Sequence, residues 1–515
     1  MQITKPKASF AGIVSLSLLY LLLPNILFLF GWVQWWYAIP AVIMLITATL
    51  HICKHLPLHQ HTFTKKDIPS LLCSFFICIV AVESLGYTGR VPQSSDFLAR
   101  NAIFDTLVNC DWPIHSCSGD YFVYYHAFYL FPSLVAKIAA PYISHYTLLY
   151  VWTLFGLLLA AGLLSLKYGA KKGALALLFF LLIGYTSDLA WVILRLDSHL
   201  DNTFVHAITT NLNKYPWRLH SSYASIWRGV AIDSPHHALP ILLFLLLVST
   251  NSLSKKHIFY VASLIVICSP LSSIFVLLFL IIRYWRYICN KNSISELAKG
   301  ITWFAIPSLI AVVTYLTNKE STLILTPFAG KSAYYIQSWI ICYIISLSLN
   351  VIPLIYFCRR KLFSTSYFIV YLTTLIVFPF IMDRGISYMN TVLKGSLVTS
   401  FCQAQLYLSI FLHQKGYKLK LLTIIILTAS TYSILHTFKQ LSCFTVTDEK
   451  QAANIVSGWH GHLNHPNHVY YNNFFAKATK HPLLYHQESE SASHILSPFK
   501  TGKKASEQGD TPIHQ

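Results

Sequence analysis

Long apolar stretches recur along the chain and are separated by short polar segments. A helix needs about 20 apolar residues to cross the hydrocarbon core of a bilayer, so each stretch is a candidate membrane span. The first is too long for a removable signal peptide and lacks a small-residue cleavage site, so we interpret it as a retained span. The candidate spans are approximately 10–31, 35–53, 68–86, 146–166, 173–194, 236–251, 258–283, 299–317, 333–355, 364–381, 391–412 and 421–438.

The composition supports the same class of protein. Only 11% of the residues are charged, whereas a typical soluble protein has about 25%. Hydrophobic residues make up 55%, and the mean hydropathy is +0.53. A soluble globule needs more polar surface than this, and a disordered chain does not carry this much apolar mass. The sequence therefore predicts an all-α polytopic membrane protein with about 11–13 transmembrane helices.

The basic residues indicate how the chain is oriented. The formal net charge is +19, and lysines and arginines gather in short runs between apolar stretches, as in Arg359-Arg360-Lys361. Such runs are typical of cytoplasmic loops that face anionic lipid. Without a basic soluble domain they do not indicate nucleic-acid binding. Lys5 and Lys7 place the N-terminus in the cytoplasm, and the number of spans then places the C-terminus outside.

This orientation divides the chain into a transmembrane domain, 1–438, and a polar, His-rich external tail, 439–515. We expect the end of the tail to be disordered. The transmembrane domain has two external loops, a large first loop at 87–145 and a second at 195–235. A short external turn surrounds Asp383 and Arg384.

Two segments would break the charge rule if they crossed the membrane as single spans. A full span at 121–140 would move Lys167 and the lysines after it to the outside, so we expect an aromatic-rich interfacial or re-entrant helix there. A single span at 258–283 would place Arg283 on the opposite side from Lys255. We therefore expect two short helices that enter and return, with a break at Cys268-Ser269-Pro270.

Acidic residues are concentrated in the first external loop. Asp96 follows the third span, near the bilayer surface, where a carboxylate can deprotonate an acceptor hydroxyl or bind a divalent cation. Asp105 and Asp111 follow it as possible acidic partners, and Asp383 is a third. The alternative is that these carboxylates are solvated, or that Asp96 caps a helix that runs from Phe97.

Cationic candidates lie in the other two external regions. The second loop contains Arg218 and ends with His236 and His237, immediately before a span. Arginine suits bidentate contacts to phosphate, and histidine can bind phosphate, donate a proton to a leaving group or bind a metal. Arg384 is the best single candidate for a phosphate contact. The alternatives are interfacial anchoring for the loop, and snorkelling or a local ion pair for Arg384.

The remaining candidates are histidines and cysteines. A short run of the tail contains four histidines that are candidate ligands for Zn²⁺ or Cu²⁺, with a solvated loop as the alternative. These residues are His460, His462, His465 and His468.

Cys110 and Cys117 share one polar loop, and they either pair in an oxidising compartment or are two free thiols. The sequence contains no GxxxxGK[ST] motif, which argues against a nucleotide-hydrolysing pump.

Three stretches resemble uncharacterised bacterial multi-pass membrane proteins related to the GT-C superfamily of integral-membrane glycosyltransferases. They are Asp96–Pro113 (DFLARNAIFDTLVNCDWP), Ser234–Pro240 (SPHHALP) and Asp383–Ser387 (DRGIS), and the aromatic stretch Tyr124–Pro132 is also similar. The resemblance implies a GT-C-like fold, a polyprenyl-phosphate-linked sugar as donor, and a catalytic carboxylate at Asp96. Many members have a second acid beside it (DxD or ExD), which this chain lacks, so the use of a divalent cation stays open.

These features predict a glycosyltransferase of the bacterial inner membrane, which moves a sugar from a polyprenyl-phosphate-linked donor to a glycan, lipid or protein acceptor of the cell envelope. Asp96 would be the general base, and Arg384, with His236 or His237 and Arg218, would neutralise the leaving phosphate. The rival hypotheses are a lipid-linked glycan transporter (flippase) and a non-enzymatic envelope protein. A transporter needs a polar path through the bilayer midplane, and the spans here are largely apolar.

Overall fold

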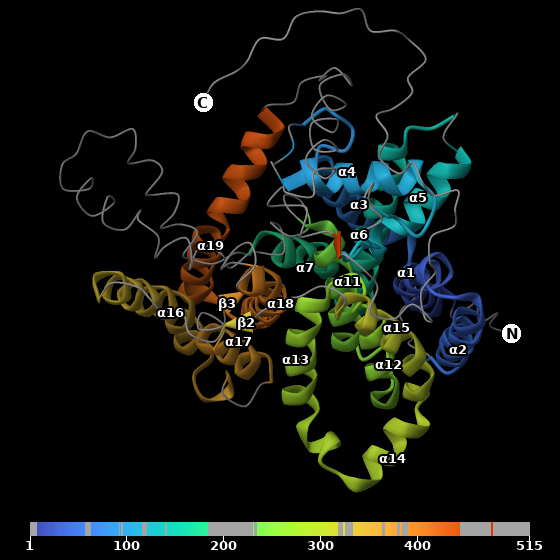
Figure 1. Ribbon diagram of the computed structural model, residues 1–515. Helices are drawn as coiled ribbons and strands as arrows, with labels where there is room; N and C mark the ends of the chain where they lie inside the picture. Colours follow the sequence, from blue (N-terminus) through green and yellow to red (C-terminus); the bar gives the residue numbers. More distant parts are fainter. Residues whose placement is uncertain are drawn as a thin grey trace, which may run out of the picture.

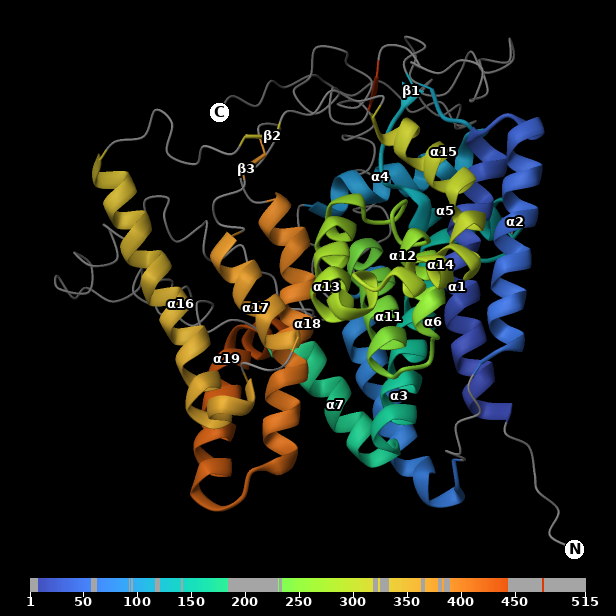
Figure 2. The ribbon, with the colours of Figure 1, turned by 90° about the horizontal axis from the view of Figure 1, so that it is seen from below.

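The computed structural model describes most of the apolar stretches and part of the segments between them. The described residues are 8–56, 63–91, 93, 96–115, 121–139, 142–183, 230, 234–317, 323–324, 333–362, 366–377, 382–383, 390–442 and 475–476. Within these ranges the chain is helical apart from short turns and strands of two residues each. Figures 1 and 2 show the arrangement from two directions.

The helices of the first half of the chain are α1 (Ala8–Trp32), α2 (Trp35–Lys54), α3 (Ile68–Glu83), α4 (Asp96–Asn109), α5 (Ala127–Ala139), α6 (His145–Tyr168), α7 (Ala170–Leu182) and α11 (Pro235–Ser249). Those of the second half are α12 (Ile258–Ser263), α13 (Pro270–Ile288), α14 (Lys291–Lys299), α15 (Ile306–Thr317), α16 (Ala333–Leu362), α17 (Ser366–Val377), α18 (Asn390–His413) and α19 (Gly416–Ser442). Short 3₁₀ helices are η1 (Lys65–Asp67), η3 (Lys255–His257) and η4 (Thr302–Ala305).

Two small antiparallel strand pairs complete the described structure. Strand β1 (Tyr121–Phe122) pairs with β4 (Phe475–Ala476), and β2 (Leu323–Ile324) pairs with β3 (Met382–Asp383). Figure 2 shows α4, β1 and the β2–β3 pair toward the upper end of the view, whereas α7 lies in the lower half. Polar segments far apart in the sequence are thus brought to one end of the helices.

Each predicted apolar stretch contains a helix, which confirms the helical class. Among the described residues, 5 helices are long and apolar enough to cross a membrane, or up to 6 if the bent pair formed by α14 and the η4–α15 segment is one span. These are α1, α2, α6, α13 and the greater part of α18. The chain is therefore a multi-pass helical membrane protein. The larger count of 11–13 spans stays a prediction, as do the division at residue 438 and the orientation.

The predicted break within 258–283 is confirmed, but only the first of the two helices is short, because α13 has 19 residues and is long and apolar enough to cross a membrane. Helix α12 ends at Ser263, and α13 begins at Pro270, whose ring suits the first turn of a helix because no amide hydrogen is needed there. Ser269 precedes it in a non-helical conformation with φ −152° and ψ 74°. The proline therefore starts a new helix after the turn.

The aromatic segment 121–140 does not cross the membrane as a single span, as predicted, but its rings do not lie at the headgroups. A strand and a turn precede α5, which at 13 residues is too short to cross a bilayer. The side chains of Phe122, Phe128 and Tyr129 are 4%, 1% and 1% exposed, so they face the interior of the protein and not a headgroup layer. The segment packs against α1, α4 and α6. An aromatic run alone does not reveal whether its partner is lipid or protein.

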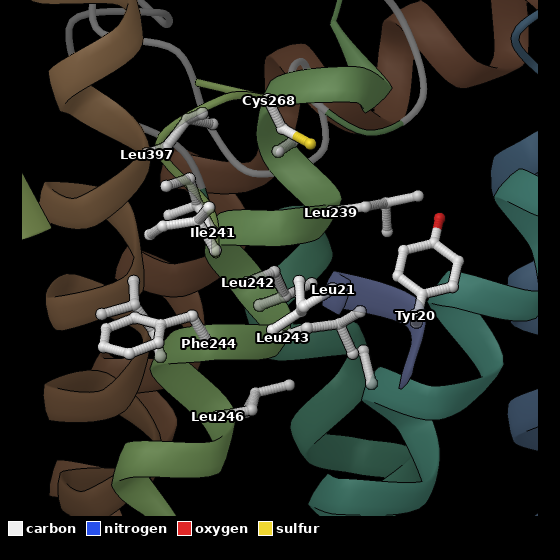
Figure 3. Packing of buried hydrophobic residues seen from close by; sticks show 14 of the residues in the cluster. Tyr20, Leu21, Leu239, Ile241, Leu242, Leu243, Phe244, Leu246, Cys268 and Leu397 are labelled. Carbon is white, nitrogen blue, oxygen red and sulfur yellow. The ribbon is translucent and has the colours of Figure 1, made fainter. Parts of the chain in front are cut away.

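Helix α11 forms the centre of the molecule. All 15 of its residues are buried, because its sequence is apolar on every face, as expected for a helix enclosed by others. It packs against α1, α6, α13 and α18. Figure 3 shows Ile241 and Phe244 on the side that faces α18, and Leu242 toward Leu21 of α1. This enclosure fixes the first turn of α11, which carries the paired histidines.

Candidate functional site

The paired histidines lie at the first turn of α11 and are buried. His236 and His237 are 1% and 2% exposed. The Nδ1 atom of His236 lies 3.1 Å from the hydroxyl of Tyr129 in α5. His237 donates from Nδ1 to the carbonyl of Cys268, 3.1 Å away, in the turn before α13. Both rings are therefore held in defined orientations by partners on other elements.

The rings of Tyr124 and Tyr125 lie beside this pair and are called the aromatic wall below. The ring of Tyr125 lies 6.0 Å from that of His236 with an interplanar angle of 10°, and 4.6 Å from that of His237. The two imidazoles are 4.0 Å apart, and Tyr124 lies 3.9 Å from Tyr125. Flat rings of this kind can cover the apolar face of a sugar or an isoprenoid chain while their polar atoms form hydrogen bonds.

A buried arginine of α4 joins the cluster. Arg100 is 8% exposed, and its Nη2 donates to the hydroxyl of Ser234, 3.3 Å away, immediately before α11. Its guanidinium lies 5.3 Å from the centre of the Phe97 ring. Burial raises the pKa of Tyr124 well above its usual value, and the charge of Arg100 opposes this rise. The positive charge of Arg100 thus affects Tyr124 of the aromatic wall, and its guanidinium contacts Ser234 at the start of α11.

The combination is suited to an anion. A guanidinium supplies directed N–H donors that match phosphate oxygens. The first turn of the 15-residue helix α11 adds the positive end of a helix dipole. Pro235 has no N–H group, and the N–H groups of His237 and Ala238 donate to the carbonyl of Ser234. Imidazole and tyrosine hydroxyl groups can donate further hydrogen bonds. Donors of these kinds match the oxygens of a phosphate monoester or diester.

Asp96 is the first residue of α4, one helical turn before Arg100. The predicted helix from Phe97 therefore exists, and the backbone of Asp96 lies near the arginine that contacts Ser234. Arg100 itself escaped the sequence reasoning, although a charged residue within an otherwise apolar turn (FLAR followed by NAIF) was a usable signal. Only the tertiary structure, which brings α4 to Ser234, gives this arginine its place.

The other acids of the first loop contact different partners. Asp105 Oδ1 lies 2.6 Å from Nε2 of His145, the first residue of α6, so its carboxylate links α4 to α6. Asp111 is exposed and its negative charge attracts the ammonium group of Lys137 in α5. Burial lowers the pKa of Lys137, and the charge of Asp111 offsets part of this decrease. The amine of Lys137 donates to the carbonyl of Cys110. Asp105 and Asp111 therefore have structural roles in the described contacts.

Asp383 is described and belongs to β3, which pairs with β2 and packs beside α18. The remaining predicted residues lie outside the described part of the chain. They are Arg218, Arg384, Cys117, His460, His462, His465 and His468. Within the described residues, no group of three or more histidine, cysteine, aspartate or glutamate side chains could hold a metal ion. The predicted metal site in the tail and the Cys110–Cys117 pairing stay predictions.

Comparison of the chain with protein-family models, with curated proteins and with solved structures finds no match. The residues of the site and the membrane character of the helices around it therefore indicate the function.

Proposed function

We propose that the chain is a membrane glycosyltransferase that moves a sugar from a polyprenyl-phosphate-linked donor to an acceptor outside the cytoplasm. The observation that carries this proposal is the convergence of Arg100, His236 and His237 at the first turn of α11. A buried anion site among apolar helices suits a phosphate attached to a lipid. Aromatic rings beside it suit the sugar or the first isoprenoid units.

In this proposal the reaction is a single displacement at the anomeric carbon. Asp96 accepts the proton of the acceptor hydroxyl as the new C–O bond forms. The bond between the anomeric carbon and the phosphate oxygen breaks, and the phosphate leaves with the electron pair. Arg100 and the paired imidazoles stabilise its negative charge. One base and one leaving group imply inversion at the anomeric carbon.

The proposal includes the finer features that the sequence predicts. These are a GT-C-like arrangement of 11–13 spans, a large first external loop, and insertion in a bacterial cytoplasmic membrane with the N-terminus inside. Arg384 and Arg218 would add to the cationic surface on the same side. A divalent cation, if used, would bind near Asp96, where a carboxylate is available.

The experiment is sugar transfer by the purified protein in lipid nanodiscs, with a labelled polyprenyl-phosphate sugar as donor. Asp96→Asn is expected to lower the rate by about 10²–10⁴-fold. Arg100→Gln is expected to lower it by about 10²–10³-fold. Arg90→Gln removes an exposed arginine before α4 and is the matched control, so it should retain the wild-type rate. Full activity of both Asp96→Asn and Arg100→Gln would refute the site.

A lipid-linked glycan transporter is the second candidate, and one observation favours it. Helix α18 contains buried polar residues, namely Ser396, Thr399, Ser400 and Gln403. Thr399 donates to the hydroxyl of Thr374 in α17 at 2.9 Å. Polar residues along a span can line a path for a headgroup. Movement of a labelled lipid-linked sugar across proteoliposomes without transfer would favour this candidate, and inactivity in both assays would favour a non-enzymatic envelope protein.

A further inference from the structure

A second cluster of cations lies at the far end of α6 from the first loop. His145, which contacts Asp105, begins this 24-residue helix, and Lys167 lies at its last turn. At 1.5 Å per residue the two are about 33 Å apart, close to the thickness of the hydrocarbon core of a bilayer. Figure 2 shows α7, which follows Lys167 in the chain, in the lower half of the view, away from α4. The cluster is therefore separate from the candidate active site.

Lys167 is held by neutral groups. Its Nζ donates to Oε1 of Gln405 in α18 at 3.0 Å and lies 4.9 Å from the centre of the Tyr168 ring. The side-chain amide of Gln405 in turn donates to the hydroxyl of Tyr168 at 2.7 Å. These contacts fix the ammonium group between α6 and α18, but none of them supplies a negative charge.

Arg283 of α13 occupies a similar environment. Its guanidinium carbon lies 4.8 Å from the centre of the Tyr367 ring and 5.9 Å from that of Phe279. Its Nη1 lies 3.5 Å from the hydroxyl of Ser366 at the start of α17. The planar cation is thus partly buried between aromatic rings, and its partners are the neutral hydroxyls of Ser366 and Tyr284.

The two positive charges act on each other. Lys167 and Arg283 are both partly buried and meet beside α18. Lys167 contacts Gln405, and the Tyr367 ring beside Arg283 lies 6.5 Å from the ring of Phe401, one turn before Gln405. The arginine charge repels the lysine charge. Across the described residues, neither side chain contacts a carboxylate. Partly buried cations that repel each other are costly unless an anion compensates them. Three further basic residues, Arg359, Arg360 and Lys361, belong to the last turn of α16, four residues before α17 begins.

We propose that Lys167 and Arg283 bind the phosphate group of an anionic phospholipid at the membrane face opposite the candidate active site. The lipid source follows from α13 itself, which is long and apolar enough to cross a membrane and exposes Ile274 (61%), Leu277 (48%) and Trp285 (60%) on the face turned away from Arg283. Lipid therefore surrounds the helix that carries Arg283, and lipid headgroups are a phosphate source at its end. By the positive-inside rule this face is cytoplasmic, where anionic lipids attract basic residues. The inference is independent of the proposed function.

The test measures lipid binding by the full chain, with phosphatidylglycerol titrated into detergent-solubilised protein and bound lipid counted by native mass spectrometry. Lys167→Gln and Arg283→Gln are each expected to weaken binding about tenfold, and Lys167→Arg should retain it. Lys171→Gln removes the same charge from an exposed position at the start of α7 and should bind like wild type. Thermal unfolding without lipid should show neither glutamine variant destabilised, because each removes a repelling charge.

Three results would overturn the inference. One is equal binding of phosphatidylglycerol by wild type, Lys167→Gln, Arg283→Gln and Lys171→Gln. Another is equal binding of neutral phosphatidylcholine by wild type. The third is thermal stabilisation by inorganic phosphate as large as that by phosphatidylglycerol, because the ligand would then be a free anion. If one glutamine variant fails to fold, the other variant and Lys167→Arg still decide the outcome.

Discussion

Mild acid is expected to destabilise the protein through His126, a histidine buried beside the aromatic wall. It is 1% exposed, and its ring lies 4.4 Å from that of Trp32 and 5.2 Å from that of Phe122. Its Nδ1 donates to the carbonyl of Tyr124 at 2.8 Å, so the neutral ring carries its proton there. Within the described structure Nε2 is buried with no partner, and protonation would leave a charged N–H without an acceptor.

The sign and size of the effect follow from the pKa. Burial lowers the pKa of His126 to about 3 from 6.5. Below pH 6.5 the unfolded chain therefore binds a proton that the folded protein does not, so stability falls as the pH drops from about 6.5 toward 3 and is unaffected above that range. Each full pH unit costs at most about 1.4 kcal/mol, which gives a loss of about 2 kcal/mol between pH 8 and pH 5.

The assay compares wild type with His126→Asn by chemical unfolding in detergent at about pH 8 and about pH 5. Asparagine retains an N–H donor for the Tyr124 carbonyl but does not titrate. Wild type should lose about 2 kcal/mol more than the variant over this interval. His55→Asn removes an exposed histidine and should keep the wild-type pH dependence. If wild type and His126→Asn lose stability equally, the argument from burial is wrong.

Two further predictions concern a close contact between helices and a buried hydrogen bond, and both are checked by thermal unfolding. Gly173→Ala should destabilise the protein by about 1–3 kcal/mol, because the added Cβ would lie 2.5 Å from the Cα of Ser165 where α7 meets α6. Gly12→Ala, in open space on α1, should instead stabilise it by up to about 1 kcal/mol, and equal effects of the two changes would refute the close approach. Tyr315→Phe removes the hydroxyl that donates to the Phe122 carbonyl at 2.6 Å. It should cost about 1–3 kcal/mol, and an unchanged melting temperature would show that the buried carbonyl finds another donor.

The positions of the helices were predictable because a membrane imposes a local rule. Backbone groups in hydrocarbon must form hydrogen bonds within their own segment, so a long apolar stretch becomes a helix wherever it occurs. The break before Pro270 was predictable for a similar reason, since proline lacks the amide hydrogen that an interior turn requires. These are properties of short segments, and the sequence contains them in full.

The environment of the aromatic segment 121–140 could not be predicted in this way. Its rings were expected at the lipid headgroups, yet Phe128 and Tyr129 are buried in protein. Lipid chains and protein interiors are both apolar, so hydrophobicity does not distinguish a surface that faces one from a surface that faces the other. The rings face protein because α5 packs against α1, α4 and α6.

The candidate site divides in the same way. The sequence by itself determined that this is a helical membrane protein, and it marked His236 and His237 as polar residues at the start of an apolar stretch. Tertiary structure alone brought Arg100 to Ser234, 134 positions away, and joined Asp105 to His145. The physical reason is that helix formation depends on neighbours within a few residues, whereas the meeting of two polar side chains depends on how whole helices pack. That packing is set by the sum of many apolar contacts around α11, and no single motif encodes it.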